Sequence, residues 1–357
     1  MIPQSLNGPD LSAIPSKMKA LILKEPGNIS FEEVDVPSMG EGDLLVRVMA
    51  STTCGTDLKA FRRGHPQIPM PGVFGHEYSG TVVAAGEGAK FAPGTDIMGV
   101  HSAPCLNCYW CKRRQENLCE TIMSSKVLGS FAEYIVIPKR IADLNVFEKP
   151  AHVPFDLASL LEPYSCVAQA IDEMRLGLGL PKGLHDDLRI LIIGPGAIGL
   201  LFVAGLREIG VDNITLAGRN PGRLSVGQAF GAKTITIDEG FQPDGVGYDV
   251  VIECTGQVDV WQRSIDFVRR GGVLVLFGGC AAGTQVTFDT KRVHYDQISI
   301  LSPFHFGTSA VARAREWIIK PRVDLSLLLS GDRSLESGTE VFADLESGKG
   351  IKYVFRP

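Results

Sequence analysis

Two patterns of hydrophobic and polar positions divide the chain. From about residue 18 to residue 155, short apolar runs alternate with turns that contain proline and glycine, which is typical of strands in a mostly β domain. The runs cover residues 19–23, 44–50, 81–85, 96–100 and 131–137. We expect no lasting helix in this part of the chain, apart from a short helical turn near residues 56–63.

After residue 156 the pattern changes to alternating strands and helices. A helix-like segment at residues 157–176 and a Gly/Pro linker at residues 177–183 precede an apolar strand at residues 188–193. Further strands are expected at residues 213–217, 234–237, 250–253 and 273–277, with helix-like segments between several of them. This alternation predicts an α/β fold with a doubly wound parallel sheet of the Rossmann type.

A glycine fingerprint follows the strand that ends at residue 193 and opens the next helix. It consists of Gly194, Pro195, Gly196, Ala197, Ile198 and Gly199. In this context the G-x-G-x-x-G spacing predicts a dinucleotide site, because the glycines allow a tight turn and a close approach of pyrophosphate to the helix N-terminus. Two later strands end at Thr255-Gly256 and Gly278-Gly279, which either flank the nicotinamide and ribose or are ordinary turns.

The second strand of this sheet lacks the acidic residue that would hold the adenosine ribose of NAD. Gly218 stands at the expected place, and Arg219, Asn220 and Arg223 follow it. Glycine leaves room for a 2′-phosphate and a guanidinium can bind it bidentately, so we predict a preference for NADP over NAD. The alternative is that Arg219 and Arg223 are solvated side chains in a loop.

Cys54, His76 and Glu77 bring three metal-ligand types together in the β domain. A thiolate, an imidazole and a carboxylate, with a fourth position left for water or substrate, are typical of catalytic zinc. The alternative is a buried thiol, a hydrogen-bonded core histidine and a surface glutamate.

A second group of cysteines predicts a structural zinc lobe at about residues 105–119. Its members are Cys105, Cys108, Cys111 and Cys119. Four thiolates in one short loop complete a tetrahedral shell and leave no position for substrate. An iron–sulfur cluster, a disulfide knot and a nucleic-acid-binding zinc ribbon are alternatives, but the spacing fits the bacterial ferredoxin run poorly and the chain is acidic.

Composition narrows the partners. A chain of 357 residues is long enough for two domains, and its net charge of −5 argues against nucleic acid or an anionic membrane as a partner. Residues 1–17 are polar and lack the apolar core of a signal peptide, so we expect a loose N-terminal arm and a cytoplasmic protein. The longest apolar run, residues 190–206, is interrupted by glycine and proline and is therefore no membrane span.

In combination, these motifs resemble the zinc-dependent medium-chain dehydrogenases/reductases of the alcohol dehydrogenase superfamily, over nearly the whole chain. Glu162-Pro163, where ordinary alcohol dehydrogenases have a cysteine, is similar to the sorbitol and threonine dehydrogenase branch. The resemblance implies a GroES-like catalytic domain at residues 1–155 that holds both zinc ions, a Rossmann domain at residues 156–302, and a return to the catalytic domain at residues 303–357. It also implies a homo-oligomer, either a dimer or a tetramer, joined through an edge strand near residues 285–288.

The resemblance also implies a ligand set. Cys54, His76 and Glu77 would hold the catalytic zinc, and Glu162 either binds the metal as well or holds the water beside it. Which of the two glutamates is the third ligand stays open at this point. Zinc would act as a Lewis acid on the substrate oxygen while hydride passes to or from the nicotinamide.

The resemblance also suggests roles for four further residues. Thr56 would relay the substrate proton and Asp57 would fix the tautomer of His76, although both also suit a simple helix cap. Lys59 stands where relatives often have a relay histidine, which leaves the proton route beyond Thr56 open. His305 lies near the place where polyol dehydrogenases tend to carry a substrate-binding arginine.

We therefore predict an enzyme that uses NADP(H) and two zinc ions per chain to interconvert a small secondary alcohol, namely a polyol, cyclitol or amino-alcohol, and its ketone. An NAD-dependent enzyme similar to L-threonine 3-dehydrogenase is one alternative. A non-catalytic relative that only binds NADPH is another, and it would have no need of the catalytic zinc ligands.

Overall fold

A computed structural model describes residues 14–178, 187–237, 241–243 and 245–357 of the chain. The chain forms two compact units, Met1–Glu162 together with Ser330–Pro357, and Pro163–Leu329. The second unit is therefore one continuous insertion into the first, and it extends further toward the C-terminus than the boundary expected at residue 302. Nearly all of the expected N-terminal arm and most of the linker at residues 177–183 lie outside the described residues.

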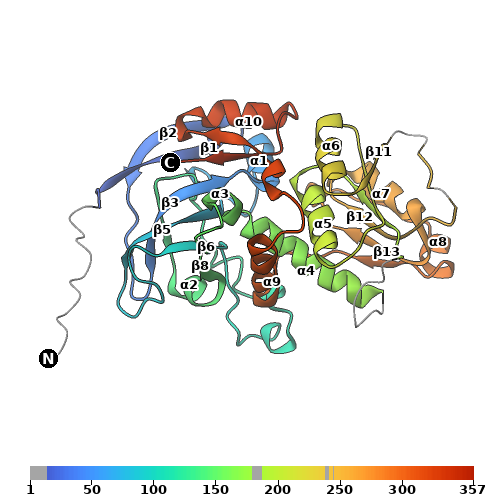
Figure 1. The fold of residues 1–357 in the computed structure, drawn as a ribbon, viewed down its shortest axis with the longest axis horizontal. Coiled ribbons are helices and arrows are strands. Elements are labelled where there is room, and N and C mark those ends of the chain that lie inside the picture. Colours follow the sequence, from blue (N-terminus) through green and yellow to red (C-terminus); the bar gives the residue numbers. More distant parts are fainter. Residues whose placement is uncertain (1–13, 179–186, 238–240, 244) are drawn as a thin grey trace. The chain divides into compact units, whose positions relative to one another are not determined.

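The first unit is built mainly from strands in two sheets (Figure 1). A three-stranded sheet has the order β2-β1-β4, and a seven-stranded sheet has the order β15-β16-β3-β5-β6-β8, with β7 paired to β3. The strands are β1 (Lys17–Glu25), β2 (Asn28–Asp35), β3 (Leu44–Thr52), β4 (Gly72–Val73), β5 (Glu77–Ala85), β6 (Asp96–Gly99), β7 (Tyr134–Ile137), β8 (Val146–Glu148), β15 (Leu329–Arg333) and β16 (Lys352–Phe355). Since β16 pairs with β3, the end of the chain completes a sheet that its beginning started.

Among the described residues, the helices that accompany these strands are α1 (Gly55–Arg63), α2 (Lys139–Asn145), α3 (Phe155–Ala158) and α10 (Gly338–Glu346). The next helix after α3 in the chain, α4 (Leu161–Gly177), begins where the first segment of this unit ends. The helix α2 contradicts the expectation that no helix other than α1 occurs before residue 155. Its length of seven residues explains why no helical period was visible in the sequence.

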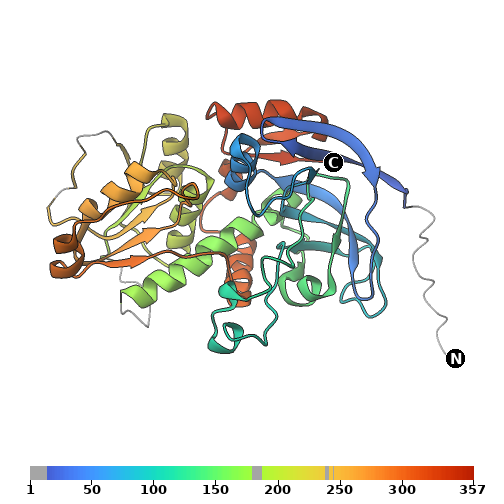
Figure 2. The same cartoon turned by 180° about the vertical axis from the view of Figure 1, so that it is seen from behind.

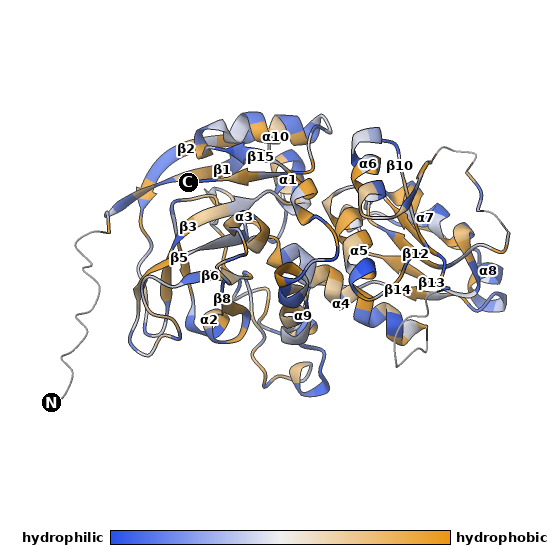
Figure 3. Cartoon of the chain, in the orientation of Figure 1, coloured by the Kyte–Doolittle hydropathy of each residue, from blue (hydrophilic) through white to orange (hydrophobic). Residues whose placement is uncertain are grey.

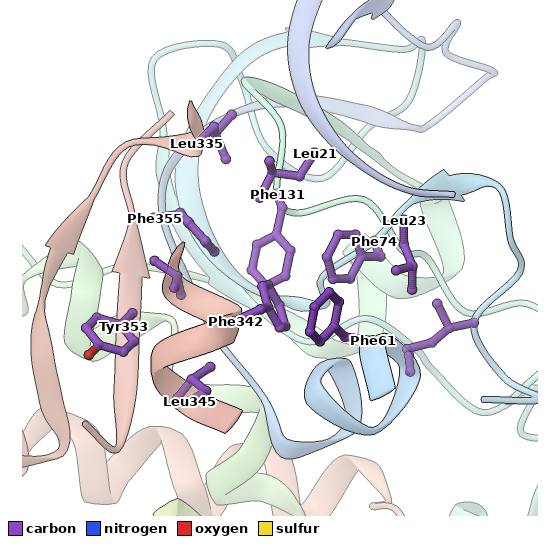
Figure 4. Packing of buried hydrophobic residues seen from close by; sticks show 13 residues of the cluster. Leu21, Leu23, Phe61, Phe74, Phe131, Leu335, Phe342, Leu345, Tyr353 and Phe355 are labelled. Carbon is purple, nitrogen blue, oxygen red and sulfur yellow. The ribbon is translucent and has the colours of Figure 1, made fainter. Parts of the chain in front are cut away.

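An aromatic cluster forms the main core of the first unit (Figure 4). The rings of Phe131 and Phe355 have centroids 4.9 Å apart, and those of Phe131 and Phe74 are 5.0 Å apart in an edge-to-face arrangement. Phe342 of α10 packs against the same group. The core thus joins residues from both ends of the chain, as the red and blue ribbons of Figures 1 and 2 indicate.

The second unit contains one six-stranded sheet with the order β11-β10-β9-β12-β13-β14, in which every pair is parallel. Its strands are β9 (Ile190–Ile193), β10 (Ile214–Gly218), β11 (Lys233–Thr236), β12 (Tyr248–Glu253), β13 (Val268–Leu276) and β14 (Ser299–Leu301). Its other helices are α5 (Ala197–Glu208), α6 (Pro221–Ala229), α7 (Val258–Ser264), α8 (Thr290–Tyr295) and α9 (Thr308–Ile319). The central strands are hydrophobic throughout (Figure 3), as is expected for a sheet covered on both faces.

These two architectures confirm the predicted fold class. The doubly wound order of the second sheet is the Rossmann order, in which ligands bind beyond the carboxyl ends of the strands. The prediction of an edge strand near residues 285–288 is wrong, because those residues form no strand and the edge strands of the sheet are β11 and β14. Among the described residues, no helix has the length and apolar character that crossing a membrane requires.

Candidate active site and cofactor site

The N-terminus of α1 positions the first candidate metal ligand. Cys54 precedes the helix, and its Sγ accepts a hydrogen bond from the backbone N–H of Thr56 at 3.4 Å. Asp57 in turn accepts from the backbone N–H of Cys54 at 3.0 Å, which completes a capping box. The Sγ of Cys54 thus lies at the N-terminus of α1, where the helix dipole is positive.

Asp57 also contacts the second candidate ligand. Its Oδ1 lies 3.3 Å from Nδ1 of His76, and both side chains are buried. Burial would lower the pKa of His76, but the charges of Asp57 and Cys54 outweigh it and hold that pKa well above its usual value. The two carboxylate oxygens of Asp57 thus face the two expected partners, because Oδ2 accepts from the N-terminus of α1 and Oδ1 lies next to the imidazole of His76.

Cys54, His76 and Glu77 form a group that could hold a metal ion. One donor atom from each lies within 4.8 Å of the other two, and His76 and Glu77 are buried. This mixture of sulfur, nitrogen and oxygen donors fits zinc. Glu162 does not belong to the group, so the arrangement favours Glu77 as the third protein ligand.

A buried lysine also contacts Glu77, the third member of this group. Lys352 of β16 places its Nζ 2.8 Å from Oε1 and 2.6 Å from Oε2 of Glu77, and it donates to the carbonyl of Thr53 at 2.6 Å. The hydroxyl of Thr52 also donates to Glu77. Burial opposes the charge on Lys352, but the charge of Glu77 raises the pKa of Lys352 above its usual value.

A second buried histidine lies beside the metal group. The ring of His101 is 5.2 Å from that of His76, and its Nδ1 is 3.3 Å from Oε1 of Glu162. Burial, together with the charge of His76, holds the pKa of His101 well below its usual value, so its imidazole is neutral at pH 7. Glu162 is thus placed next to the group through His101 rather than within it.

The four-cysteine lobe fits a tetrahedral ion. The Sγ atoms of Cys108 and Cys111 are 3.5 Å apart and those of Cys105 and Cys111 are 4.0 Å apart, close to the roughly 3.8 Å that four zinc–sulfur bonds require. The backbone N–H of Cys105 donates to Sγ of Cys119 at 3.2 Å. Backbone N–H groups of Cys111 and Glu120 lower the pKa of Cys108 to about 6, which favours a thiolate.

The fingerprint after β9 has the shape of a pyrophosphate cradle. A side chain at Gly194, whose φ is +107°, would meet Thr255 at 2.8 Å, and one at Gly199 would meet the carbonyl of Gly194 at 2.0 Å. At Gly196, by contrast, an added Cβ would meet nothing within 4 Å, which leaves open space at the N-terminus of α5. The space lies where the phosphates of a dinucleotide are bound in such folds.

The end of β10 is shaped by the same fingerprint. An added Cβ at Gly218 would lie 2.2 Å from Cδ of Pro195, so no side chain, acidic or otherwise, can stand there. Arg219 is exposed, and no carboxylate among the described residues pairs with it. Asn220 caps α6 by accepting from the backbone N–H of Arg223 at 3.1 Å, and burial lowers the pKa of the half-buried Arg223.

The turns after β12 and β13 are tied together by a residue that the sequence did not reveal. Glu253 is fully buried and accepts from the backbone N–H of Thr255 at 2.6 Å and from that of Gly256 at 3.1 Å. The hydroxyl of Thr255 donates to the same carboxylate. The carbonyl of Gly278 accepts from Nε1 of Trp261 at 2.7 Å, so these turns have a fixed shape beside the fingerprint.

The remaining candidates are placed as follows. Thr56 and Lys59 are half-buried on α1, close to Cys54 in sequence. His305 is nearly buried with a φ of +62°, and its ring stacks on Phe306 with centroids 4.0 Å apart. A positive φ at a histidine is strained, and such strain is concentrated at functional positions. Gly279 lies in the turn after β13.

Comparison with known proteins agrees with this geometry. Residues 40–147 match the alcohol dehydrogenase GroES-like domain, and residues 155–301 match the glucose dehydrogenase C-terminus. The chain belongs to the zinc-dependent medium-chain dehydrogenases. It is an alcohol dehydrogenase-type oxidoreductase with a zinc and nicotinamide chemistry.

Several members of this family resemble the chain along most of its length. It is 27% identical to an L-threonine 3-dehydrogenase of Aeromonas salmonicida, over 94% of this chain and 98% of that protein. It is 29% identical to a D-altritol 5-dehydrogenase of Agrobacterium fabrum, over 80% and 83% of the two chains. A zinc-binding dehydrogenase from Sinorhizobium meliloti, solved with NADP, superposes with a TM-score of 0.84 at 28% identity, over 96% and 100% of the chains.

In this medium-chain dehydrogenase, sequence reasoning missed three buried residues near the sites. Lys352, His101 and Glu253 are each fully or almost fully buried. Glu253 carries a local signal, because it ends an apolar strand directly before Cys254-Thr255-Gly256. Lys352 lies 275 positions from its partner Glu77, and nothing in the sequence connects the two.

Proposed function

We propose that the protein transfers a hydride between NADP(H) and a small secondary alcohol or ketone, with one catalytic and one structural zinc ion per chain. The grouping of Cys54, His76 and Glu77 within 4.8 Å carries the proposal, since a protein that only binds nucleotide has no use for it. When bound there, zinc would supply Lewis-acid chemistry at the substrate oxygen.

The protein residues would divide the remaining work. Asp57 keeps His76 in the orientation and tautomer that leave its other ring nitrogen for the metal. Thr56 is the candidate for passing the hydroxyl proton onward, with Lys59 on the same helix and Glu162 beside His101 as further participants. His305 is the candidate substrate contact, and its strained backbone supports that role.

The preference for NADP rests on Gly218 and Arg219. The close approach of Gly218 to Pro195 excludes an acidic side chain that would repel a 2′-phosphate, while Arg219 is exposed beside it. Substituting Arg219→Ala should lower kcat/KM for NADP+ roughly 10–100-fold and change that for NAD+ little, because it removes charge-assisted hydrogen bonds. Arg270→Ala is the matched control, because this exposed arginine lies near the N-terminal end of β13, whereas the dinucleotide is expected at the carboxyl ends of the strands. Higher kcat/KM with NAD+ in the unaltered protein would contradict the preference.

Zinc analysis separates the enzyme from a silent relative. We expect about two zinc ions per chain, and loss of one of them in Cys108→Ser. One zinc in the unaltered protein, retained after substitution of Cys54 by serine, would support the non-catalytic reading.

The substrate would be a polyol, a cyclitol or an amino-alcohol such as threonine. The relatives named as threonine, altritol and arabinitol dehydrogenases support this range. A screen of these alcohols with NADP+ on the zinc-loaded protein tests it. Turnover of L-threonine alone with NAD+ would favour the L-threonine 3-dehydrogenase-like alternative.

We also propose that the protein is a cytoplasmic homo-oligomer. β14 is the outermost strand of its sheet, and an edge strand offers backbone groups for pairing with a second copy. Thiolate ligands also favour a reducing compartment. Light scattering of the purified protein would show a dimer or tetramer, whereas the mass of a single chain would contradict the proposal.

A further inference from the structure

A segment that carries no predicted site residue lies against both histidines of the metal region. The backbone N–H of Val127 donates to the carbonyl of His101 at 2.8 Å. Two residues on, the N–H of Gly129 donates to the carbonyl of Gly75, directly before His76, at 2.9 Å. Lys126 begins this segment, and the two backbone bonds that follow it fix the segment beside His101 and Gly75.

The ammonium group of Lys126 is only partly satisfied by the protein. Its Nζ donates to Oε1 of Gln67 at 2.8 Å and to the carbonyl of Met123 at 3.2 Å, which uses two of its three N–H donors. The side chain is partly buried. No carboxylate among the residues that the structure describes lies within ion-pair distance of it.

Other positive charges surround the same place. Burial is the largest cause of the lowered pKa of His65, and the charge of Lys126 lowers that pKa further. Lys59 and Arg63 act on His65 in the same direction. In a chain with a net charge of −5, these three cations form a local group of positive charge around His65. It favours an anionic ligand beside the metal group.

We propose that Lys126 binds an anionic group of the substrate, so that the alcohol that this site oxidises carries a carboxylate or a phosphate ester. This inference rests on the proposed function and narrows its substrate class from polyols, cyclitols and amino-alcohols in general to secondary alcohols that carry an anionic group. Lys126 would fix the anion through its third N–H, while the hydroxyl that reacts lies at Cys54, His76 and Glu77.

The alternative is that Lys126 only connects two loops through its hydrogen bonds to Gln67 and Met123, but this role does not require a charged side chain. An uncharged amide could hold Gln67 equally well, whereas a partly buried ammonium without a counter-charge loses hydration and gains no ion pair. An anionic ligand would supply the counter-charge that the ammonium group of Lys126 lacks.

The inference is tested with matched substrates. Zinc-loaded protein is assayed with NADP+ and three series of secondary alcohols, which are neutral polyols, the acids that differ from them by a terminal carboxylate, and their phosphate esters. We expect an anionic member to exceed its neutral counterpart at least about tenfold in kcat/KM, with a KM that rises with ionic strength. The carboxylate and phosphate series show which anion fits.

Three variants locate the effect. Lys126→Met should lower kcat/KM for the anionic substrate roughly 10–100-fold, mainly through KM, and leave the neutral counterpart within about threefold. Lys126→Arg should restore part of the loss. Gln67→Met removes the loop contact but keeps the charge, so it should preserve the ratio between anionic and neutral substrates, as should the exposed control Lys139→Met.

Each contrary result has a distinct meaning. If the unaltered protein oxidises only neutral alcohols, or if Lys126→Met lowers kcat/KM for both classes equally, Lys126 is a loop tie and the inference is wrong. If zinc-loaded protein that binds NADPH oxidises no alcohol of any series, the proposed function fails and takes the inference with it.

Discussion

Lys352 is buried, and a buried charge destabilises the folded protein unless an opposite charge or hydrogen bonds compensate it. It is 1% exposed, its partner Glu77 is 0% exposed, and the pair sits beside a candidate metal ligand set. An ammonium with a carboxylate and the carbonyl of Thr53 around it is fully satisfied. Removal of either partner leaves the other charge buried and uncompensated.

Lys352→Met should therefore destabilise the metal-free first unit by about 3–5 kcal/mol. Denaturant unfolding, followed by a probe in that unit, measures the change. The double variant Lys352→Met/Glu77→Gln should recover a large part of the loss, because neither charge then remains. Lys349→Met, at an exposed lysine paired with Asp344, is the control and should cost less than about 1 kcal/mol. Equal losses in both lysine variants would contradict a buried ion pair.

Asp57→Asn should weaken zinc binding at the catalytic group roughly 10–100-fold, because His76 loses the acceptor that orients it. Competition with a chromogenic chelator measures the affinity. Asp143→Asn, at an exposed residue paired with Lys139, should leave the affinity unchanged. An unchanged affinity in Asp57→Asn would show that the aspartate serves the helix cap alone.

The contact between Asp57 and His76 predicts that the folding stability of the metal-free protein depends on pH. Since the folded-state pKa of His76 is raised above its unfolded value, its stabilising effect is complete below about pH 6.5 and is lost as the pH rises through the raised pKa. The stability difference between the unaltered protein and Asp57→Asn should accordingly shrink with rising pH. A difference that grows between pH 6 and pH 9 would contradict this sign.

Sequence reasoning found the residues of this site that lie in local motifs and missed those that do not. Cys54, His76 and Glu77 are recognisable because metal ligands of three kinds occur on one short segment. Lys352 and Lys126 are ordinary lysines in the sequence, and their importance arises from distant contacts. The helix α1, which brings Cys54 and Asp57 into register, made the local part predictable.

At the scale of elements, the turn after β12 is held by several hydrogen bonds to one buried carboxylate. The carboxylate of Glu253 holds the N–H groups of Thr255 and Gly256, and Gly278 approaches the same carboxylate so closely that a Cβ there would lie 2.7 Å from it. The turns after β9, β12 and β13 are thus packed together.

Glu253→Ala should raise the Kd for NADPH at least about tenfold, because two backbone donors lose their acceptor at roughly 1–3 kcal/mol each. Fluorescence titration of NADPH measures it, while zinc content, which depends on the other unit, should stay the same. Glu316→Ala, at an exposed glutamate of α9, is the control. If NADPH binds Glu253→Ala as it binds the unaltered protein, the turn holds its shape without the carboxylate.

Elements with a strong apolar pattern were predictable and weakly patterned ones were not. The strands β9, β10, β12 and β13 were expected close to their observed positions, because buried parallel strands form continuous apolar runs. β2 was missed, since most of its residues are partly or fully exposed and its sequence contains charged residues. Long elements with one buried face are visible in sequence, and short or solvated ones depend on their neighbours.

At the scale of the whole molecule, the second unit interrupts the first. Ser330–Pro357 supplies β16 and α10, including Phe342, Tyr353 and Phe355 of the aromatic core. A fragment of residues 163–329 should therefore fold and bind NADPH by itself, whereas residues 1–162 alone should not fold, because their core lacks those aromatic side chains. Circular dichroism and calorimetry of the two fragments test this.

The control joins residues 1–162 to residues 330–357 through a flexible Gly/Ser linker. This chain contains both sheets of the first unit and should fold and bind zinc. Cooperative folding of residues 1–162 without the C-terminal segment would show that β16 is dispensable.

The pairing of β16 with β3 also fixes an order of events during synthesis. Residues 163–329 can fold as soon as they leave the ribosome, while the first unit waits for the strand that emerges after them. At about 5–20 residues per second, the 167 residues of the insertion delay its closure by roughly 10–30 s. Throughout that interval Phe74 and Phe131 lack the contacts that Phe342 and Phe355 later supply, so we expect the nascent chain to depend most on chaperones before residues 330–357 emerge.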